Sequence, residues 1–372
     1  MTGSERSFYT RELAALSRLG RFREPSGIDP AAIDMASNDY LGLAHRKKLL
    51  KKACKRLFEY PWHAPKSSLF VGGHHPIHRG FEQALCRANG FESGIVAGSG
   101  FLANLGLIEA LVRREDTLFI DESYHASGMM ATRLVQGRVV TFLHNDPQDL
   151  IEKLANTPVK GRRIVAVEGI YSMEGDLLKR EFFEIAEWFD MLMIVDEAHS
   201  NGTVGERLLG VFDHYGIKPG TRHIKMGTLG KAYGSYGAYI LGSKEVVSFL
   251  QNRAKPLIYA TAPSLFDIAL AHEGFEYISK RQKKLGKKIE KLKSVAEAAT
   301  GRRPDGMIVP LPMPDIATAM RLKRVLKESG FEVGAIRPPT VKHPILRIIL
   351  RTSVKAKSYE KLFEKIDEAL NG

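Results

Sequence analysis

The sequence contains little cysteine and no long apolar run. Only Cys54 and Cys86 occur among 372 residues, and neither belongs to a Cys-x-x-Cys pair. This argues against a disulfide framework and favours a reducing compartment. No stretch approaches the roughly 18 apolar residues that a membrane-spanning helix needs, and the amino terminus lacks the apolar segment of a secretory signal. We therefore expect a soluble, cytoplasmic protein without a membrane partner.

Known nucleic-acid motifs and zinc fingers are also missing, although the formal net charge is +13. Such a surplus can attract nucleic acid, an anionic membrane or a phosphorylated small molecule. Part of the charge is local, because residues 280–293 carry eight Lys or Arg around Leu285, Ile289 and Leu292. That spacing is typical of one solvated helix face. Since basic residues are not interleaved with tandem aromatics, we expect no nucleic-acid partner, and we expect no metal site.

Short apolar runs alternate with helical patterns in the first two thirds of the chain. This alternation predicts βαβ units and an α/β fold with a mainly parallel sheet flanked by helices. The spacing also predicts helices over residues 77–89, ending at Gly90, and over residues 101–113. The strands that we predict are Gly94–Gly98, Thr117–Asp121, Val139–Phe142, Ile164–Glu168, Met191–Asp196 and Tyr236–Leu241.

The alternation of strand and helix patterns weakens after about residue 260, and the pattern of the remaining residues is typical of an α+β domain. We predict a long basic helix, a strand at Met307–Pro310, a helix at Ile316–Ser329, a strand at Ile345–Leu350 and a final helix. The chain is therefore expected to have three parts. Residues 1–40 form an amino-terminal segment that packs on the other domains, residues 41–260 form a large α/β domain, and residues 261–372 form a small α+β domain.

The first candidate for chemistry is Asp196, at the end of the apolar strand Met191–Asp196. Open α/β sheets place their ligand sites at the carboxyl ends of strands. Alternatively, Asp196 only caps the following turn. The sequence Asp196-Glu197-Ala198-His199 also occurs in helicases, but that interpretation needs a GxxxxGK[ST] phosphate loop upstream, and the chain has none.

The second candidate is Lys231, which lies between glycines in Thr228–Gly234, 35 residues after Asp196. A lysine among small residues can be desolvated, which lowers the pKa of its amine and suits imine chemistry. An ordinary surface lysine in a glycine-rich turn is the alternative. A strand-end aspartate followed by such a lysine supplies the two groups that pyridoxal 5′-phosphate (PLP) needs, a Schiff-base amine and an acid beside the pyridine nitrogen.

With these residues and several further motifs, the chain resembles the PLP-dependent α-oxoamine synthases of fold type I. The similarity runs from about Ser37 to Ser353. Residues 335–341, Ala-Ile-Arg-Pro-Pro-Thr-Val, point to the branch of this family that acts in biotin biosynthesis. The other matching segments are Ser37–Leu43, Gly100–Asn104, Ser123–Ser127, His144–Asp146, Glu168–Asp176 and the two segments around Asp196 and Lys231.

The resemblance implies a set of residues that bind the cofactor. Lys231 would form the Schiff base and then carry protons, Asp196 would hold the pyridinium, and His199 would bond the phenolic oxygen. His125 would stack on the ring face opposite Lys231; without this context it would be taken for a buried core histidine. Five further residues would surround the cofactor, most of them at its phosphate: Gly100 and Phe101 through backbone N–H groups, Ser172, Thr228, and Thr261 of a neighbouring subunit, which implies a homodimer with shared active sites.

Substrate contacts are implied as well. Arg347 matches the arginine that grips the amino-acid carboxylate, a role that suits a guanidinium fork, and Asn38 would assist. Thr340 and an amino-terminal arginine would contact substrate in the acyl channel; Arg23 fits the family pattern better than Arg21, which is the alternative. For Arg23 the alternative is a solvated helix end.

The implied reaction is a decarboxylative condensation of L-alanine with pimeloyl-CoA or a pimeloyl-acyl carrier protein. Alternatives within the family are 2-amino-3-oxobutyrate CoA ligase, which uses glycine and acetyl-CoA, serine palmitoyltransferase and 5-aminolevulinate synthase. A non-catalytic protein of the same fold, or a nucleic-acid-binding protein that exploits the positive charge, is the alternative from a different class.

Overall fold

The computed structural model describes residues 3–25, 27 and 29–371. The chain divides into two compact units, one ending at Ile33 and the other covering Asp34–Gly372. The first unit contains the helix α1 (Gly3–Arg18). How the first 40 residues pack on the rest stays a prediction. Within the described residues, no helix combines the length and the apolar character that crossing a membrane requires.

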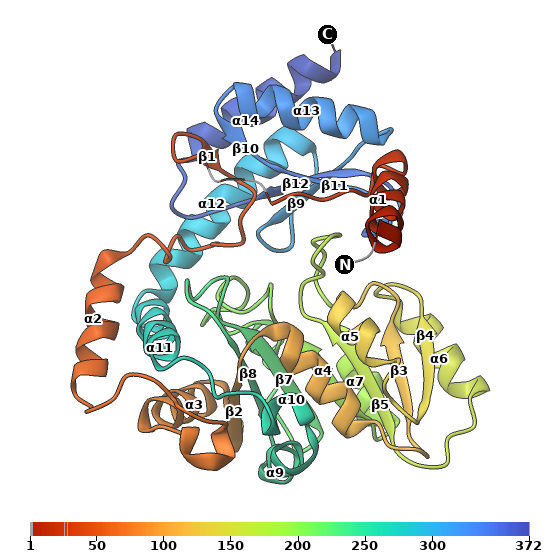
Figure 1. Ribbon diagram of the computed structural model, residues 1–372, viewed down its shortest axis with the longest axis vertical. Coiled ribbons are helices and arrows are strands. Elements are labelled where there is room, and N and C mark those ends of the chain that lie inside the picture. Colours follow the sequence, from red (N-terminus) through yellow and green to blue (C-terminus); the bar gives the residue numbers. More distant parts are fainter. Residues whose placement is uncertain (1–2, 26, 28, 372) are drawn as a thin grey trace. The chain divides into compact units, whose positions relative to one another are not determined.

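The second unit is built on a seven-stranded sheet with the order β2-β8-β7-β6-β5-β3-β4 (Figure 1). The strands β3 to β7 are parallel to one another, and β8 runs antiparallel to both of its neighbours. The strands are β2 (Ser93–Ala97), β3 (Thr117–Asp121), β4 (Arg138–Phe142), β5 (Arg163–Glu168), β6 (Leu192–Asp196), β7 (His223–Thr228) and β8 (Ala238–Gly242). This confirms the predicted α/β fold with a mainly parallel sheet.

Successive side chains of the central strands enter two different apolar cores. In β3, Leu118 and Ile120 belong to one core and Phe119 to the other. In β6, Ile194 and Val195 are divided in the same way. Because side chains alternate across a sheet, a strand that is buried on both faces must be apolar throughout, as parallel strands usually are.

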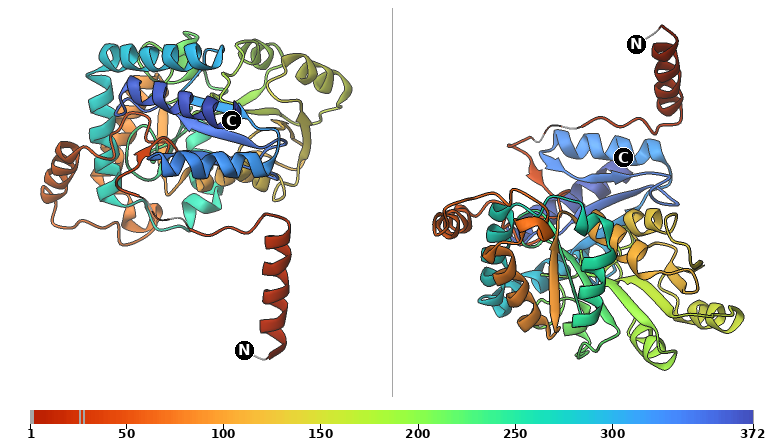
Figure 2. Two further views of the ribbon diagram at one scale, coloured as in Figure 1. Left: turned by 90° about the horizontal axis from the view of Figure 1, so that it is seen from above. Right: turned by 60° about the horizontal axis from the view of Figure 1, so that its bottom comes forward.

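Helices cover both faces of this sheet and supply the rest of the two cores (Figures 1 and 2). The helices α4, α5, α9 and α10 contribute to one core, and α3, α6, α7 and α11 to the other. The helical elements up to residue 300 are α2 (Lys47–Phe58), η1 (Leu69–Gly73), α3 (Pro76–Asn89), α4 (Gly100–Leu111), α5 (Ala126–Ala131), α6 (Pro147–Asn156), α7 (Glu181–Trp188), α8 (Val211–His214), α9 (Lys244–Arg253), α10 (Lys255–Ile258), α11 (Leu265–Ser279) and α12 (Gln282–Thr300).

The predicted strands are confirmed, most within one or two residues of their bounds, and so are the helices predicted over residues 77–89 and 101–113. The strand β7 was not predicted. Its sequence, His-Ile-Lys-Met-Gly-Thr, has Lys225 at its centre, and this side chain is completely buried. The lysine interrupts the apolar run by which the other strands were found.

A three-stranded antiparallel sheet with the order β11-β12-β9 lies in the carboxy-terminal part (Figure 1). Its strands, with the short β1 and β10 and the helices beside them, are β1 (Ile33–Asp34), β9 (Ile308–Pro312), β10 (Phe331–Glu332), β11 (Gly334–Ile336), β12 (Ile345–Ile349), α13 (Ile316–Glu328) and α14 (Ala356–Asn371). The α+β character predicted after residue 260 is confirmed. Whether a domain boundary lies near residue 260 stays a prediction.

Candidate active site

The carboxyl ends of three adjacent parallel strands, β5, β6 and β7, deliver Glu168, Asp196 and Thr228 to one edge of the large sheet. Glu168 and Asp196 are direct partners in the strand register. Lys231 follows in the turn after β7. The edge is the position at which open α/β sheets bind ligands.

Lys231 contacts His199 at this edge. Its Nζ lies 2.7 Å from Nε2 of His199, and Nδ1 of His199 lies 2.5 Å from the hydroxyl of Tyr40. When the lysine is charged it donates to Nε2, so the proton of the neutral ring lies on Nδ1. Burial keeps His199 neutral, because it lowers the pKa of the ring well below its usual range, and the charge of Lys231 acts in the same direction.

The chain of contacts continues from Tyr40 to a buried arginine. The hydroxyl of Tyr40 donates to Oδ1 of Asn38 at 3.4 Å, and the same oxygen accepts from Nη1 and Nη2 of Arg347 at 3.2 Å each. Nε of Arg347 donates to the carbonyl of Ser172 at 2.7 Å. The two terminal nitrogens thus share one neutral acceptor, which a carboxylate can replace with shorter, charge-assisted bonds.

A second set of contacts holds Asp196 and His125. Nδ2 of Asn104 donates to Oδ2 of Asp196 at 2.8 Å and to Oγ of Ser127 at 3.0 Å. Oγ of Ser127 lies 2.7 Å from Nδ1 of His125. The backbone N–H of Ala198 donates to Oδ1 of Asp196 at 2.9 Å. Asp196 therefore does cap its turn, but its carboxylate is also fixed from the side by a buried amide.

Burial shifts the pKa values of two further groups at the strand ends. It lowers the pKa of the Lys231 amine to about 8, although the Asp196 and Glu168 carboxylates act in the opposite direction. It raises the pKa of Glu168 well above its usual range, and the Asp196 charge raises it further. Oε1 of Glu168 is buried and has no hydrogen-bond partner within the part of the chain that the structure describes. The pKa values of the carboxyl of Glu168 and the amine of Lys231 are thus shifted in opposite directions, and the carboxyl has one oxygen without a partner among the described residues.

The amino terminus of α4 lies beside Thr228. A Cβ built on Gly100 would lie 3.8 Å from Cβ of Thr228, so the helix start and the end of β7 are neighbours. Ser99 caps the helix by accepting from the N–H of Leu102 at 3.2 Å. Gly100 and Phe101 begin the first turn, whose N–H groups have no acceptor within the helix. These donors suit a phosphate group.

Three predicted site residues lie elsewhere or cannot be related to this cluster. Thr261 is exposed and pairs with Ser68 in an isolated β-bridge. Thr340 is exposed in the segment between β11 and β12. Arg23 belongs to the first unit, so its position relative to Lys231 is not defined.

Sequence reasoning gave no role to four residues of the cluster: Tyr40, Asn104, Ser127 and Glu168. All four lie inside segments that carry the resemblance, so the sequence marked the segments but not these side chains. Their roles depend on which backbone segments meet in space. Among the described residues, no group of three or more His, Cys, Asp or Glu side chains is arranged to hold a metal ion.

Comparisons with known proteins find relatives that match most of this chain. The family model described as aminotransferase class I and II matches residues 30–366. An 8-amino-7-oxononanoate synthase of Helicobacter pylori strain J99 is 42% identical over 344 residues, which is 92% of each chain. A putative 8-amino-7-oxononanoate synthase of Aquifex aeolicus is 35% identical over 349 residues, covering 91% of this chain and 92% of that protein.

Solved structures show the same fold. Serine palmitoyltransferase from S. paucimobilis, with a bound PLP–myriocin aldimine, superposes with a TM-score of 0.87 at 22% identity and covers 99% of this chain and 98% of its own. The 8-amino-7-oxononanoate synthase of Francisella tularensis superposes with a TM-score of 0.76 at 23% identity, covering 92% of this chain and 99% of its own. At these identities the likeness concerns the fold.

The chain therefore belongs to the aminotransferase class I and II family, and it has the fold of the PLP-dependent enzymes of fold type I. Within that family it belongs with the 8-amino-7-oxononanoate synthases, from which it differs at little more than half of the aligned positions in the Helicobacter pylori protein. The relatives do not favour the alternative of a glycine-using ligase.

Proposed function

We propose that this chain condenses L-alanine with a pimeloyl thioester, releasing carbon dioxide and the free thiol, to form 8-amino-7-oxononanoate for biotin biosynthesis. The observation that carries the proposal is the contact of 2.7 Å between Lys231 and His199 at the strand ends that also hold Asp196, in a chain 42% identical to an 8-amino-7-oxononanoate synthase. The acyl group would be carried by CoA or by an acyl carrier protein.

The residues present fit PLP as the cofactor. Lys231 supplies a buried amine, Asp196 a carboxylate fixed by Asn104, and the start of α4 with Thr228 a place for a phosphate. His125 is held by Ser127 in the same cluster. When bound, PLP supplies an electron sink for negative charge at the α-carbon of an amino acid.

The amino acid would be positioned by its carboxylate. Arg347 is 7% exposed, and both of its terminal nitrogens donate to a neutral oxygen, Oδ1 of Asn38. An incoming carboxylate would displace that oxygen and form two charge-assisted bonds with the guanidinium fork. The released Asn38 amide would then be free to donate to the same carboxylate.

Lys231 would move the proton of the α-carbon. An effective base has a pKa near the working pH, and burial lowers the pKa of the Lys231 amine to about 8. His199 holds the amine at 2.7 Å without competing for the proton, because its own pKa is lowered by burial.

We further propose a cytoplasmic homodimer with shared sites, in which Thr261 reaches the cofactor phosphate of the neighbouring subunit. An apolar surface near Thr261 supports this: Phe70, Val71 and Tyr259 are 46%, 72% and 80% exposed, and exposed apolar groups of this kind mark interaction sites. Thr340 and Arg23 are proposed for the acyl channel. The division into parts at about residues 40 and 260 also belongs to the proposal.

Product analysis tests the reaction. The purified protein is supplied in turn with alanine, glycine or serine, each with pimeloyl-CoA or acetyl-CoA, and the products are identified by mass. We expect 8-amino-7-oxononanoate from alanine and pimeloyl-CoA and no comparable product from the other pairs. A faster reaction of glycine with acetyl-CoA would overturn the proposal.

Cofactor binding and assembly are tested separately. We expect absorbance at about 410–430 nm from the purified protein and its loss in Lys231→Ala, because this band comes from the imine of the cofactor. Sedimentation should give the mass of a dimer. A monomer that makes product at full rate would overturn the shared site, while the reaction itself would stand.

A further inference from the structure

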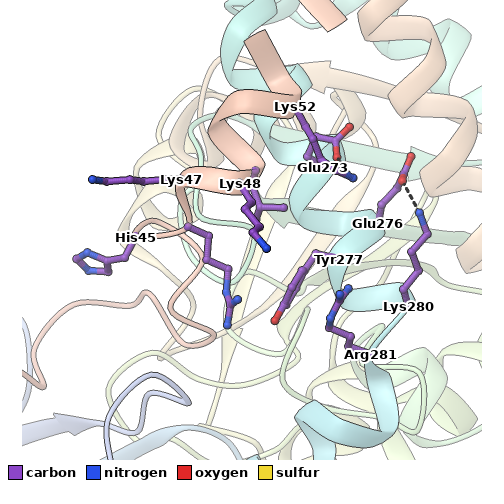
Figure 3. Close-up of a pocket in the computed structure, with 11 residues that line it drawn as sticks. His45, Lys47, Lys48, Lys52, Glu273, Glu276, Tyr277, Lys280 and Arg281 are labelled. Atoms are coloured by element: carbon purple, nitrogen blue, oxygen red, sulfur yellow. Dashed lines mark hydrogen bonds and ion pairs between the residues drawn. The ribbon is translucent and has the colours of Figure 1, made fainter. Parts of the chain in front are cut away.

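A basic pocket lies outside the candidate active site, between the start of α2, the end of α11 and the start of α12 (Figure 3). Its volume is about 480 Å³, and it shares no lining residue with the cluster around Lys231. Figure 3 shows Lys48, Tyr277 and Arg281 facing the same space. The residues that line it are His45, Arg46, Lys47, Lys48, Leu49, Lys52, Glu273, Glu276, Tyr277, Lys280 and Arg281.

The two carboxylates of the pocket are already neutralised by cations. Glu273, which is 4% exposed, accepts from Nε of Arg56 at 2.6 Å and from Nζ of Lys52 at 3.2 Å. Glu276 accepts from Nη2 of Arg56 and from Nζ of Lys280, both at 2.8 Å. Neither glutamate is left to balance the remaining positive charges.

Four further cations at the pocket have no ion pair among the described residues: Arg46, Lys47, Lys48 and Arg281. The guanidinium carbons of Arg46 and Arg281 lie 4.5 Å and 4.2 Å from the centroid of the Tyr277 ring. Two like charges are thus held close to one ring. Cation–π contacts offset only part of their repulsion, so the arrangement favours an added anion.

The helix starts at the pocket add to this potential. Arg46 is the N-cap of α2 and Arg281 the N-cap of α12; neither helix has a side-chain cap, and neither has an acidic residue in its first turn. The amino terminus of a helix carries partial positive charge, and cations there are unfavourable. By contrast, Ser243 caps α9 and Asp315 caps α13. The starts of α2 and α12, both without a side-chain cap, therefore bring Arg46 and Arg281 to the lining of one cavity.

We infer that this pocket binds a phosphate-bearing anion, either a free phosphate ion or the phosphate groups of a nucleotide-like molecule such as CoA. Guanidinium forks bind phosphate oxygens in pairs, and uncapped helix starts bind the same group through N–H donors. The guanidinium groups of Arg46 and Arg281 already lie over the Tyr277 ring, so this ring is not available to stack on a nucleotide base. The pocket therefore recognises the charge of the ligand. The anion site itself does not depend on the reaction proposed above; only its assignment to the phosphates of the acyl donor rests on that proposed function.

Calorimetric titration with pyrophosphate at low ionic strength tests the inference, using the protein loaded with its cofactor. The test variant is Arg46→Gln with Arg281→Gln. The matched control is Lys287→Gln with Lys288→Gln, which removes the same charge from two exposed residues of α12 outside the pocket. We expect the dissociation constant to rise about tenfold or more in the test variant, because charge-assisted contacts are lost, and to change less than about twofold in the control.

Equal weakening in both double variants, or no binding by the unchanged protein, would overturn the inference. Arg281→Gln alone repeats the measurement if the double variant does not fold. A second titration with CoA separates the two ligand sources. If CoA displaces pyrophosphate, the pocket serves the phosphates of the acyl donor; if it does not, the ligand is a free phosphate ion. The titration contains no amino acid, so its result does not depend on whether product forms.

Discussion

Two lysines six residues apart, the completely buried Lys225 and the partly buried Lys231, have very different surroundings. The ammonium of Lys225 donates to Oδ1 of Asn89 at 2.8 Å and to the carbonyl of Leu209, and it forms an ion pair with Oε1 of Glu197 at 3.7 Å. Among the described residues, Lys231 has one partner, His199. A lysine whose three donors are all used is part of the structure, whereas one with donors to spare can bind a ligand.

Glu197, the residue after Asp196, is a saturated acid that belongs to the surroundings of Lys225. Both oxygens of Glu197 accept from the N–H of Val211, at 3.0 Å and 2.9 Å, and Ser200 donates to it as well. A Cβ on Gly210 would overlap the Glu197 carboxylate, and Gly210 has a φ of +87°, so a side chain is excluded there for two reasons. The comparison of the two lysines teaches that donors left without protein partners mark the amine that is able to bind a ligand.

The largest effect expected from this comparison concerns Lys231. In Lys231→Ala, product formation should fall by more than about 10³-fold, because the base and the nucleophile are lost together. The free energy of unfolding should change by less than about 1 kcal/mol, since the side chain makes one hydrogen bond. Steady-state product formation and urea unfolding measure the two quantities. Residual activity above a tenth of the original would contradict the assignment.

Substituting Lys225 should have the opposite effects, namely a large loss of stability and little change in turnover. Lys225→Met should lower the free energy of unfolding by about 3–5 kcal/mol, because Glu197 is left buried without its counter-charge. The protein that remains folded should keep its absorbance and turnover. Urea unfolding followed by circular dichroism measures the loss. In the double variant Lys225→Met with Glu197→Gln, part of the lost stability should be recovered, because the two sites are coupled. If the losses of the two single variants simply add, Lys225 and Glu197 are not a coupled pair, and the comparison with Lys231 fails.

The same contrast explains what the sequence could predict of the fold. Continuous apolar runs such as Ile164–Val167 are buried on both faces, so six strands of the large sheet followed from their composition. The strand β7 did not, because Lys225 is stabilised by Asn89, Leu209 and Glu197, which come from other parts of the chain. No local pattern contains those partners.

For the site, the sequence identified groups that follow strands or glycines, such as Asp196 and Lys231. It could not identify Asn104, whose amide reaches Asp196 from 92 residues away, or Tyr40, which reaches His199 from 159 residues away. From the sequence alone, Tyr40 is taken for a core residue, and only its contact with His199 in the folded chain indicates a role in the site. Motif resemblance marked both segments, but only the folded chain shows what the side chains touch.

Two buried arginines four residues apart extend the comparison. Arg351 is bonded to the carboxylates of Asp34 at 2.7 Å and Asp39 at 3.0 Å, whereas Arg347 has only neutral acceptors. Arg347→Lys should raise the KM for alanine about 10- to 100-fold, because a lysine cannot form the paired bonds to a carboxylate. Its kcat should change less than its KM.

Arg351→Lys is the matched variant for this prediction. We expect it to lower the free energy of unfolding and to leave the KM for alanine within about threefold of the original, because its fork is already filled by protein carboxylates. Substrate-saturation curves for both variants provide the test. A larger increase in KM from Arg351→Lys than from Arg347→Lys would reverse the roles of the two residues.

The smallest effect is expected at His144, whose two ring nitrogens both have a carboxylate partner. His144 lies between Asp121, 3.4 Å from Nδ1, and Asp176, 3.2 Å from Nε2. Burial acts to lower the pKa of His144, but the hydrogen bonds that its ring donates to both carboxylates outweigh it and raise the pKa to about 10. Asp121 also accepts from the hydroxyl of Tyr171 and the N–H of Asn145, each at 2.7 Å. Because the polar groups of this cluster already have partners within the protein, we expect substitutions here to change the free energy of unfolding rather than the turnover.

The sign of the pH effect follows from the raised pKa of His144. A raised pKa in the folded state gives stability that is complete below the ordinary value of 6.5 and is lost as the pH rises toward about 10. The free energy of unfolding should therefore fall by roughly 1–3 kcal/mol more in the original protein than in His144→Gln between these limits. His63→Gln, at an exposed position, should follow the original protein, because losing a solvated histidine removes no buried contact. If His144→Gln and the original protein give parallel curves, the ring is neutral in the folded state, and saturation by two carboxylates is not enough to keep a buried histidine charged.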